Sequence, residues 1–228
     1  MAEVISLTKT YRLRECGFYQ GAPLVNSRFP ELHTAQAVTH LVTVGACTLD
    51  ALEVSNAEYL LFLKATGYAP LEQRNFLKHW LDGIPRAGEE DLSVVYVDLI
   101  DARAYCAWAG TRLPTEDEWQ IGMLRGGGRR EPHVWNWTES ERVDGRTRFC
   151  ILKGGCDHVA HGSEWYADGG VHGPEFGAKF LLTYPGLDRC TTIGFRSITN
   201  HAPGAVRPTS ATTSALTSAS STASIRLG

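Results

Sequence analysis

The densest group of chemically reactive side chains in this sequence lies in one short segment, residues 156–168. Within it, Cys156 supplies a thiol, and His158 and His161 supply two imidazoles. Because a soft sulfur ligand together with two imidazoles suits copper or zinc, these three residues form a candidate metal site. The segment contains no CxxC motif. The alternative is therefore that both histidines are ordinary residues of a surface loop.

A second hypothesis for the same residues is nucleophilic catalysis by Cys156. The thiolate is the reactive form of cysteine, and a neighbouring imidazole that accepts the proton favours it. His158 or His161 could act as this base, which makes Cys156, His158 and His161 the candidate catalytic residues. Cysteine is also among the residue types that are most often buried, so simple packing of Cys156 remains the alternative.

A third hypothesis treats the glycine-rich connections around this segment as a binding surface for a small molecule or a protein. Aromatic and polar side chains gather there, as expected where a rigid scaffold presents a pocket. The candidate binding residues are Trp137, Glu164, Trp165, Tyr166 and Asp168, with His172, Glu175 and Asp188 in the connections that follow. The residues that could line the same face are Arg74, Asn75, His79 and Trp80. An ordinary solvated loop with some buried aromatics has the same composition.

The overall composition is that of a globular protein. The 228 residues are 43% hydrophobic and include six tryptophans, enough to bury a sizeable core within one domain. The formal net charge is −3, and the Lys and Arg residues are scattered along the chain. Because phosphate recognition needs a concentrated basic field, we expect no nucleic-acid partner.

The two ends of the sequence suggest where the domain lies. Residues 1–9 show no apolar run behind a positive stretch, and no segment approaches the roughly 18 apolar residues needed to cross a bilayer. We therefore expect a cytoplasmic protein without a membrane partner, whose six cysteines are free thiols. Residues 203–224 are dominated by Ser, Thr and Ala, a composition typical of disorder. We expect one domain over residues 1–202 and a disordered tail over residues 203–228.

Three helices that would position these segments are predicted from their capping signals. Ser55 followed by Glu58 forms a capping box, and Gly67 supplies a left-handed stop, so we expect a helix over residues 56–66. The same pattern recurs in residues 98–101 before a stop at Gly110, and the apolar stripe of this second helix is Ala102, Tyr105, Cys106 and Ala109. On this stripe Cys106 is interpreted as a packing residue. Residues 115–118 open a third helix, which the glycines at 126–128 end.

Short runs of β-branched and aromatic residues predict strands at 40–44, 94–97, 148–153, 179–184 and 192–198. Helical patterns thus come first and strand patterns dominate later. This order favours the α+β class, in which a few helices pack beside short, mainly antiparallel strands, over a regular βαβ array.

Five sequence motifs, in order, resemble the formylglycine-generating-enzyme (sulfatase-modifying-factor) superfamily. Residues 52–59 resemble its "EVTNAQY" helix start, and residues 101–119, DARAYCAWAGTRLPTEDEW, resemble its most recognisable stretch. Residues 134–138 are similar to its "VWEWT", 152–156 to its "LRGGS" and 193–196 to its terminal "GFR".

The resemblance implies a loop-rich, C-type-lectin-like fold. Four aromatic residues would then fill its core: Trp119, Trp135, Trp137 and Phe195. Arg112 and Arg196 would act as structural clamps, because one guanidinium can satisfy several acceptors.

The functions that the resemblance implies are several. Some members oxidise a sulfatase cysteine with copper and oxygen, others form the second domain of ergothioneine-type sulfoxide synthases, and others are lectin-like binding proteins. A metal- and oxygen-dependent oxidoreductase that uses copper or iron is therefore one hypothesis for this chain. The alternatives are a non-catalytic ligand- or protein-binding module and a truncated, inactive paralogue, since fold alone does not choose among them.

This sequence departs from the family's pattern at the metal sites. Val159 and Glu164 stand roughly where copper-dependent members carry two cysteines after the "GGS" turn, and neither side chain can replace a thiolate. Residues 132–136 read PHVWN where a calcium-binding member reads "GNVWE", and the interval over residues 120–133 is short. We therefore expect the calcium site to be degraded. Sulfoxide-synthase chemistry would require a separate iron-binding partner domain.

Overall fold

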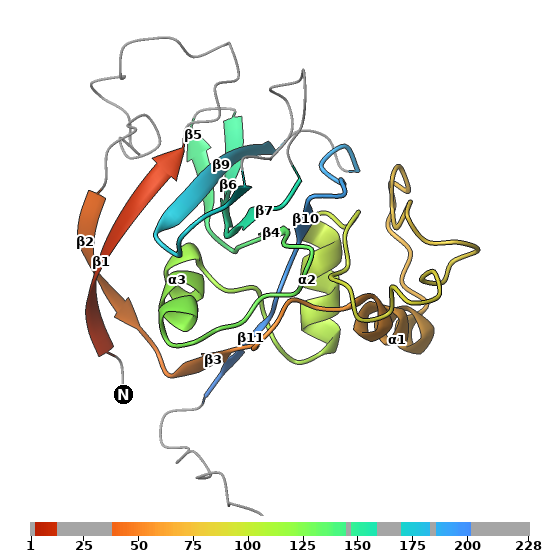
Figure 1. Ribbon diagram of the computed structural model, residues 1–228, viewed down its shortest axis with the longest axis horizontal. Coiled ribbons are helices and arrows are strands. Elements are labelled where there is room, and N and C mark those ends of the chain that lie inside the picture. The colour runs from red at the N-terminus through yellow and green to blue at the C-terminus, as the bar shows by residue number, and fades with distance from the viewer. Residues whose placement is uncertain (1–2, 13–37, 145–146, 159–169, 183–185, 202–228) are drawn as a thin grey trace, which may run out of the picture.

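The computed structural model describes residues 3–12, 38–144, 147–158, 170–182 and 186–201. Within these ranges the chain forms a mixed sheet flanked by three helices (Figure 1). The helices are α1 (Asn56–Thr66), α2 (Leu99–Trp108) and α3 (Glu116–Leu124). In Figure 1, α3 lies under the sheet, and α2 stands between the sheet and α1. This arrangement confirms the α+β class.

The main sheet has the strand order β10-β4-β6-β9-β1-β2, with β5 paired to β6. Its strands are β1 (Glu3–Arg12), β2 (Val38–Val44), β4 (Trp135–Asn136), β5 (Glu141–Asp144), β6 (Thr147–Lys153), β9 (Phe176–Leu182) and β10 (Ile193–Gly194). Two smaller pairs are β3 (Cys47–Leu49) with β11 (Ile198–Asn200), and β7 (Gly155–Cys156) with β8 (Gly170–Val171). Most pairs are antiparallel, while β1 with β9 and β10 with β4 are parallel.

The three helix starts are confirmed by reciprocal capping boxes. In α1, the Glu58 backbone N–H donates to Ser55 Oγ, and Glu58 Oε2 accepts from the Ser55 backbone N–H. The starts of α2 and α3 have the same arrangement. The end of α1 is also as expected, because Gly67 is left-handed at φ 65° and its N–H donates to the Leu63 carbonyl. In the stripe of α2, Ala109 is exposed, in contrast to the prediction, because the helix already ends at Trp108.

Several strand predictions need correction. Residues 94–97 form no strand: Val94 and Val97 are fully buried, and Tyr96 at φ 55° interrupts the extended backbone between them. Their β-branched character therefore reflects burial in the core. Residues 192–198 divide into β10 and β11, and the strand expected at 179–184 begins earlier, at Phe176. The expected order of helices before strands is wrong, since β1 and β2 precede α1.

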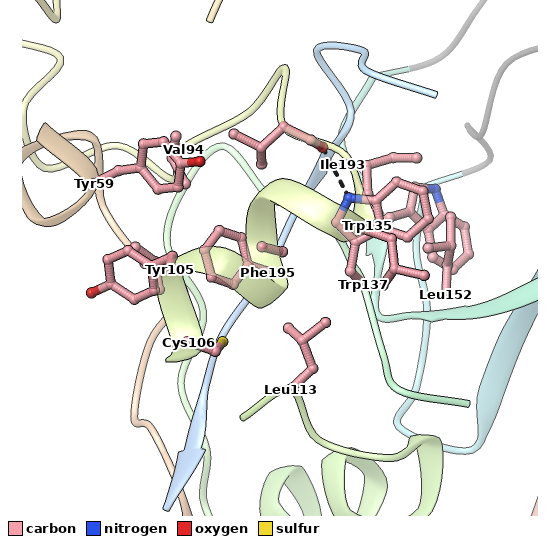
Figure 2. Packing of buried hydrophobic residues seen from close by; sticks show 14 of the residues in the cluster. Tyr59, Val94, Tyr105, Cys106, Leu113, Trp135, Trp137, Leu152, Ile193 and Phe195 are labelled. Carbon is pink, nitrogen blue, oxygen red and sulfur yellow. Dashed lines mark hydrogen bonds between the residues drawn. The ribbon is translucent and has the colours of Figure 1, made fainter. Parts of the chain in front are cut away.

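The core gathers the aromatic residues that the sequence indicated. Trp119, Trp135, Trp137 and Phe195 are each at most 1% exposed. Figure 2 shows Trp135 and Trp137 beside Leu152 and Ile193, with Phe195 next to Tyr105. The Tyr59 ring stacks on Tyr105 and meets Phe195 edge-on, with centroids 5.7 and 6.2 Å apart. Aromatic burial thus holds together a domain with little regular structure.

In the part of the chain that the structure describes, no helix has the length and apolar character to cross a membrane. The five cysteines in these ranges, Cys47, Cys106, Cys150, Cys156 and Cys190, are free thiols. The tail expected over residues 203–228 lies outside the described residues, and its disorder and a cytoplasmic location stay predictions.

The cap of α3 can be tested by substitution of Thr115. Its hydroxyl accepts from the Glu118 backbone N–H at 3.2 Å, so we expect Thr115→Ala to lower the free energy of unfolding by about 1 kcal/mol in a urea titration. The control is Thr115→Ser, which keeps the hydroxyl and should stay near the stability of the natural chain. Equal losses in the two variants would contradict a capping role.

Candidate functional site

The reactive segment 156–168 follows a turn that only glycine can make. Gly154 and Gly155 have φ values of 97° and 74°, and a Cβ on Gly155 would lie 2.1 Å from the Gly170 carbonyl oxygen. After this turn Cys156 enters β7, which pairs with β8. The pairing of Cys156 with Gly170 places the two ends of the intervening segment side by side.

Cys156 is 1% exposed, and its thiol donates to the backbone carbonyl oxygen of His158 at an Sγ–O distance of 3.4 Å. The His158 residue itself is exposed. Backbone and imidazole of His158 thus have different surroundings: the first accepts from the buried thiol, and the second faces solvent. The remaining predicted residues of this segment, His161, Glu164, Trp165, Tyr166 and Asp168, lie outside the described residues, as does Val159. Their roles stay predictions.

Among the residues that the structure describes, no three His, Cys, Asp or Glu side chains converge in a way that could hold a metal ion. Two other thiols are held neutral. Burial raises the pKa of Cys150 to about 12, and its Sγ donates to the Thr138 carbonyl at 3.3 Å. Burial likewise raises the pKa of Cys106 to about 12, and the thiol is 1% exposed. The interpretation of Cys106 as a packing residue is therefore confirmed, and both Cys106 and Cys150 keep their protons at neutral pH.

Trp137, proposed as a binding residue, is fully buried. Its indole N–H donates to the Val97 carbonyl at 3.0 Å, and its ring meets Phe180 edge-on at 5.3 Å. Trp137 therefore belongs to the core and is not a surface contact, which corrects that assignment. Sequence reasoning placed it correctly among the core aromatics.

His172 lies beside the glycine turn, where its backbone N–H donates to the Gly154 carbonyl at 3.3 Å. Its ring stacks on Phe176 with centroids 3.8 Å apart, and it lies tilted against the Trp135 ring with centroids 5.8 Å apart. Glu175 is exposed nearby. The described border of the segment thus offers a partly buried imidazole and an exposed carboxylate, which fits the predicted mixture of aromatic and polar groups.

Below the turn, a buried network joins Glu53, Arg196, Asn136 and Trp119. Arg196 Nη2 donates to Glu53 Oε1 at 2.7 Å, and Arg196 Nε donates to Asn136 Oδ1 at 2.9 Å. The Trp119 indole N–H donates to the same Asn136 oxygen at 2.9 Å. The glutamate and arginine side chains are both 0% exposed. The clamp role of Arg196 is confirmed.

Arg112 is the second confirmed clamp. Its guanidinium donates to both carboxylate oxygens of Glu118, at 2.7 and 2.6 Å, and to Asn200 Oδ1 at 2.8 Å. The start of α3 is thereby tied to β11. Glu53, Glu118 and Asn136 were not identified as partners from the sequence. Glu53 lies in the helix-start motif, but nothing local in it specifies an arginine 143 residues away.

Arg129 lies beside the glycine turn and was not identified from the sequence. Its guanidinium donates to the carbonyl oxygens of Val134 and Gly155 at 2.7 and 2.9 Å, and also to that of Gly154. The Val134 carbonyl belongs to residues 132–136, the segment that corresponds to a calcium-binding motif, and the other two belong to the glycine turn. Calcium needs several free oxygen ligands. Here a fixed cation already takes three carbonyls, and Asn136 Oδ1 already accepts from Trp119 and Arg196. These residues therefore do not fit a calcium ion.

Comparison with known proteins identifies relatives of this chain. The family described as sulfatase-modifying factor enzyme 1-like domain matches residues 6–150. This range includes most of β1 and all three helices but ends before the reactive segment.

Individual relatives carry different names. An inactive C-alpha-formylglycine-generating enzyme 2 from Mus musculus is 27% identical in an alignment 149 positions long, which covers 50% of this chain and 48% of the relative. A formylglycine-generating enzyme from Streptomyces coelicolor is 30% identical in an alignment 156 positions long, which covers 53% of this chain and 48% of the relative. A hercynine oxygenase from Mycolicibacterium thermoresistibile is 30% identical in an alignment 123 positions long, which covers 42% of this chain and 26% of the relative. The chain thus spans about half the length of the first two relatives.

The buried network can be tested with Glu53→Gln, which removes the charge but keeps the shape. Burial alone raises the pKa of Glu53, but the Arg196 charge and the Arg130 backbone N–H outweigh it, so the net pKa is lowered. Such a carboxyl stabilises the fold above its ordinary pKa and loses this contribution as the pH falls through the lower, folded-state value. We therefore expect the free energy of unfolding to fall below about pH 4.5 in the natural chain and to fall less steeply in the variant.

At neutral pH, Glu53→Gln should cost about 3 kcal/mol or more, because Arg196 is left buried without its counter-charge. Urea titrations over a pH series measure both effects, with the exposed Glu131→Gln as the control. Identical pH slopes and unchanged stability would show that the ion pair contributes nothing.

Proposed function

Because the chain belongs to the sulfatase-modifying factor enzyme 1-like family, we propose that it is a ligand- or protein-binding member that does not itself oxidise sulfatase cysteines. This proposal rests on the types of residue that follow the glycine turn. From the family resemblance, Val159 and Glu164 stand roughly where copper-dependent members carry two cysteines, and neither side chain can ligate Cu(I) as a thiolate does.

The surroundings of the described thiols support the same proposal. The Cys156 thiol is buried and donates to a backbone carbonyl, and the pKa of Cys150 is raised to about 12 by burial. The surroundings of Cys150 therefore disfavour a thiolate at neutral pH. One relative of this chain is itself named an inactive formylglycine-generating enzyme, which is consistent with a scaffold that is retained without the oxidation chemistry.

We also propose that the core is a variant of the C-type lectin scaffold. Family membership supports this assignment, as do the short mixed strands and the long irregular connection between α1 and α2. In this scaffold the loops that border β7 and β8 would present the ligand, and we propose Trp165, Tyr166 and Asp168 as binding residues.

A second function, a metal- and oxygen-dependent oxidoreductase related to sulfoxide synthases, is favoured by two observations. The exposed His158 lies two residues from Cys156, and one relative is named a hercynine oxygenase. Cys156, His158 and His161 would hold the metal, and a separate domain would supply iron ligands. Any such metal would supply the oxygen chemistry, while the residues of this chain would bind and orient the substrate.

The main proposal predicts that the purified chain, supplied with Cu(I) and oxygen, converts no cysteine of a sulfatase-type peptide to formylglycine. Mass spectrometry of the peptide measures the conversion, with the Streptomyces coelicolor enzyme as the positive control. The double variant Val159→Cys/Glu164→Cys should bind Cu(I) more tightly than the natural chain in a chelator competition, since it restores two soft ligands. Formylglycine made by the natural chain would refute the proposal.

The second function predicts near-stoichiometric copper or iron in the purified protein, measured by plasma mass spectrometry. Cys156→Ala and His158→Ala should each remove most of this metal, because each deletes one of three ligands. His40→Ala, on β2, is the control and should retain it. Metal content that is negligible, or unaffected by either site substitution, rules out this metal site.

A further inference from the structure

A cavity of about 260 Å³ lies where the segment that leads into α1 meets α2. In Figure 1 this is the place where the chain runs from β3 into α1, beside α2. The cavity is lined by residues 50–54, by Glu58 on α1, by Tyr105 on α2 and by Arg130. It shares no residue with the reactive segment. The space is large enough for several water molecules or for a small organic group.

The Tyr105 hydroxyl is a polar group of this cavity that the fold leaves without a partner. The residue is only 8% exposed, because its ring packs against Tyr59 and Phe195. Figure 2 shows the hydroxyl pointing away from the Phe195 ring. It forms no hydrogen bond with the described residues, and unlike the Tyr59 hydroxyl it is not closed off from solvent. This oxygen is therefore available to a ligand in the cavity.

Two carboxylates line the same space. The Glu58 side chain, in the first turn of α1, is 51% exposed, so a ligand can approach it from solvent. Asp50 is half-buried and accepts a hydrogen bond from the neutral Ser197 hydroxyl. Burial raises the pKa of Asp50, and the Glu58 charge acts in the same direction. Burial likewise raises the pKa of Tyr105 to about 12, with contributions from Glu58 and Asp50. The two carboxylates and the hydroxyl therefore lie within range of one another's charge.

The other charged residues of the lining leave this negative charge incompletely neutralised. The Glu53 carboxylate is 0% exposed and is paired with Arg196. Arg130 donates to the carbonyls of Glu53 and Asp91 at 2.8 and 2.9 Å, and its Nη2 lies 3.7 Å from Glu58 Oε2. Asp50 and Glu58 thus carry two negative charges against the single positive charge of Arg130. One further monovalent cation would balance them.

We propose that this cavity binds a small primary alkylammonium ion, attracted by Asp50 and Glu58 and donating a hydrogen bond to the Tyr105 hydroxyl. Attraction between unlike charges extends over several Å, so it does not require one fixed spacing of the carboxylates. An ammonium group carries only donors, and the carboxylates and the tyrosine oxygen can all accept. The apolar part of the lining, against which the alkyl chain packs, is Ala51, Leu52 and Val54.

The test compares n-butylammonium with n-butanol, which has nearly the same shape but carries no charge. Binding to the full chain is followed at neutral pH by protein-observed NMR titration. We expect saturable binding of n-butylammonium, with shifts at residues around the cavity, and binding of n-butanol that is weaker by about tenfold or more, because the charge attraction is lost. No saturable binding of n-butylammonium, or equal affinity for the two probes, would overturn the proposal.

Two substitutions test the acceptors. Glu58→Gln removes one negative charge but keeps the capping box, since glutamine can take the same place in it. This variant should bind n-butylammonium about tenfold more weakly. Tyr105→Phe removes only the unpartnered hydroxyl and should bind the cation about threefold more weakly, because one neutral acceptor is lost.

The ring of Tyr105→Phe still stacks on Tyr59, so its thermal unfolding midpoint should match that of the natural chain. Glu3→Gln, which removes the same charge from an exposed position on β1, is the matched control and should bind n-butylammonium normally. Unchanged affinity in Glu58→Gln and Tyr105→Phe, or an equal loss in Glu3→Gln, would show that the cation binds elsewhere and would also overturn the proposal. None of these outcomes depends on the copper chemistry of the proposed function.

Discussion

The buried ion pair between Glu53 and Arg196 joins residues that lie 143 positions apart in the chain, with both side chains at 0% exposure. Removing two charges from water costs several kcal/mol per ion, and their attraction offsets this cost only when the remaining donors and acceptors are also satisfied. Here they are. Arg196 also donates to Asn136 and to the Gly128 carbonyl, and Glu53 accepts from the Arg130 backbone N–H. These bonds hold three parts of the chain in one arrangement: the residues just before α1, strand β4, and the connection between β10 and β11.

The same network extends to the turn that precedes the reactive segment. Arg129 lies 3.5 Å from Glu53 and donates to the carbonyls of Gly154 and Gly155. The position from which Cys156 leaves this turn therefore depends on the buried charges and not on any metal ligand. This separation explains how one scaffold can host members with and without oxidation chemistry. The fold-determining contacts lie below the turn, and the residues that would ligate copper lie after it.

Features of the fold could be predicted from the sequence where the interacting residues lie close together in the chain. A capping box joins residues three positions apart, so the starts of all three helices were determined locally. The burial of Trp119, Trp135 and Trp137 was also expected from the motifs that contain them. By contrast, β1 was missed because its pairing depends on Val38–Val44 and on Phe176–Leu182. Residues 94–97 were misread because a β-branched run is compatible both with a strand and with buried irregular backbone.

By itself, then, the sequence determined the family, the α+β class, the helix starts and the lack of a cysteine pair at positions 159 and 164, since each depends on residue identity or on short-range contacts. Only the tertiary structure decided that Glu53 neutralises Arg196, that Arg129 takes the carbonyls beside the glycine turn, and that Trp137 packs inside. The physical reason is that buried polar groups must find partners wherever the folded chain places them, and no local pattern records which distant residue that will be.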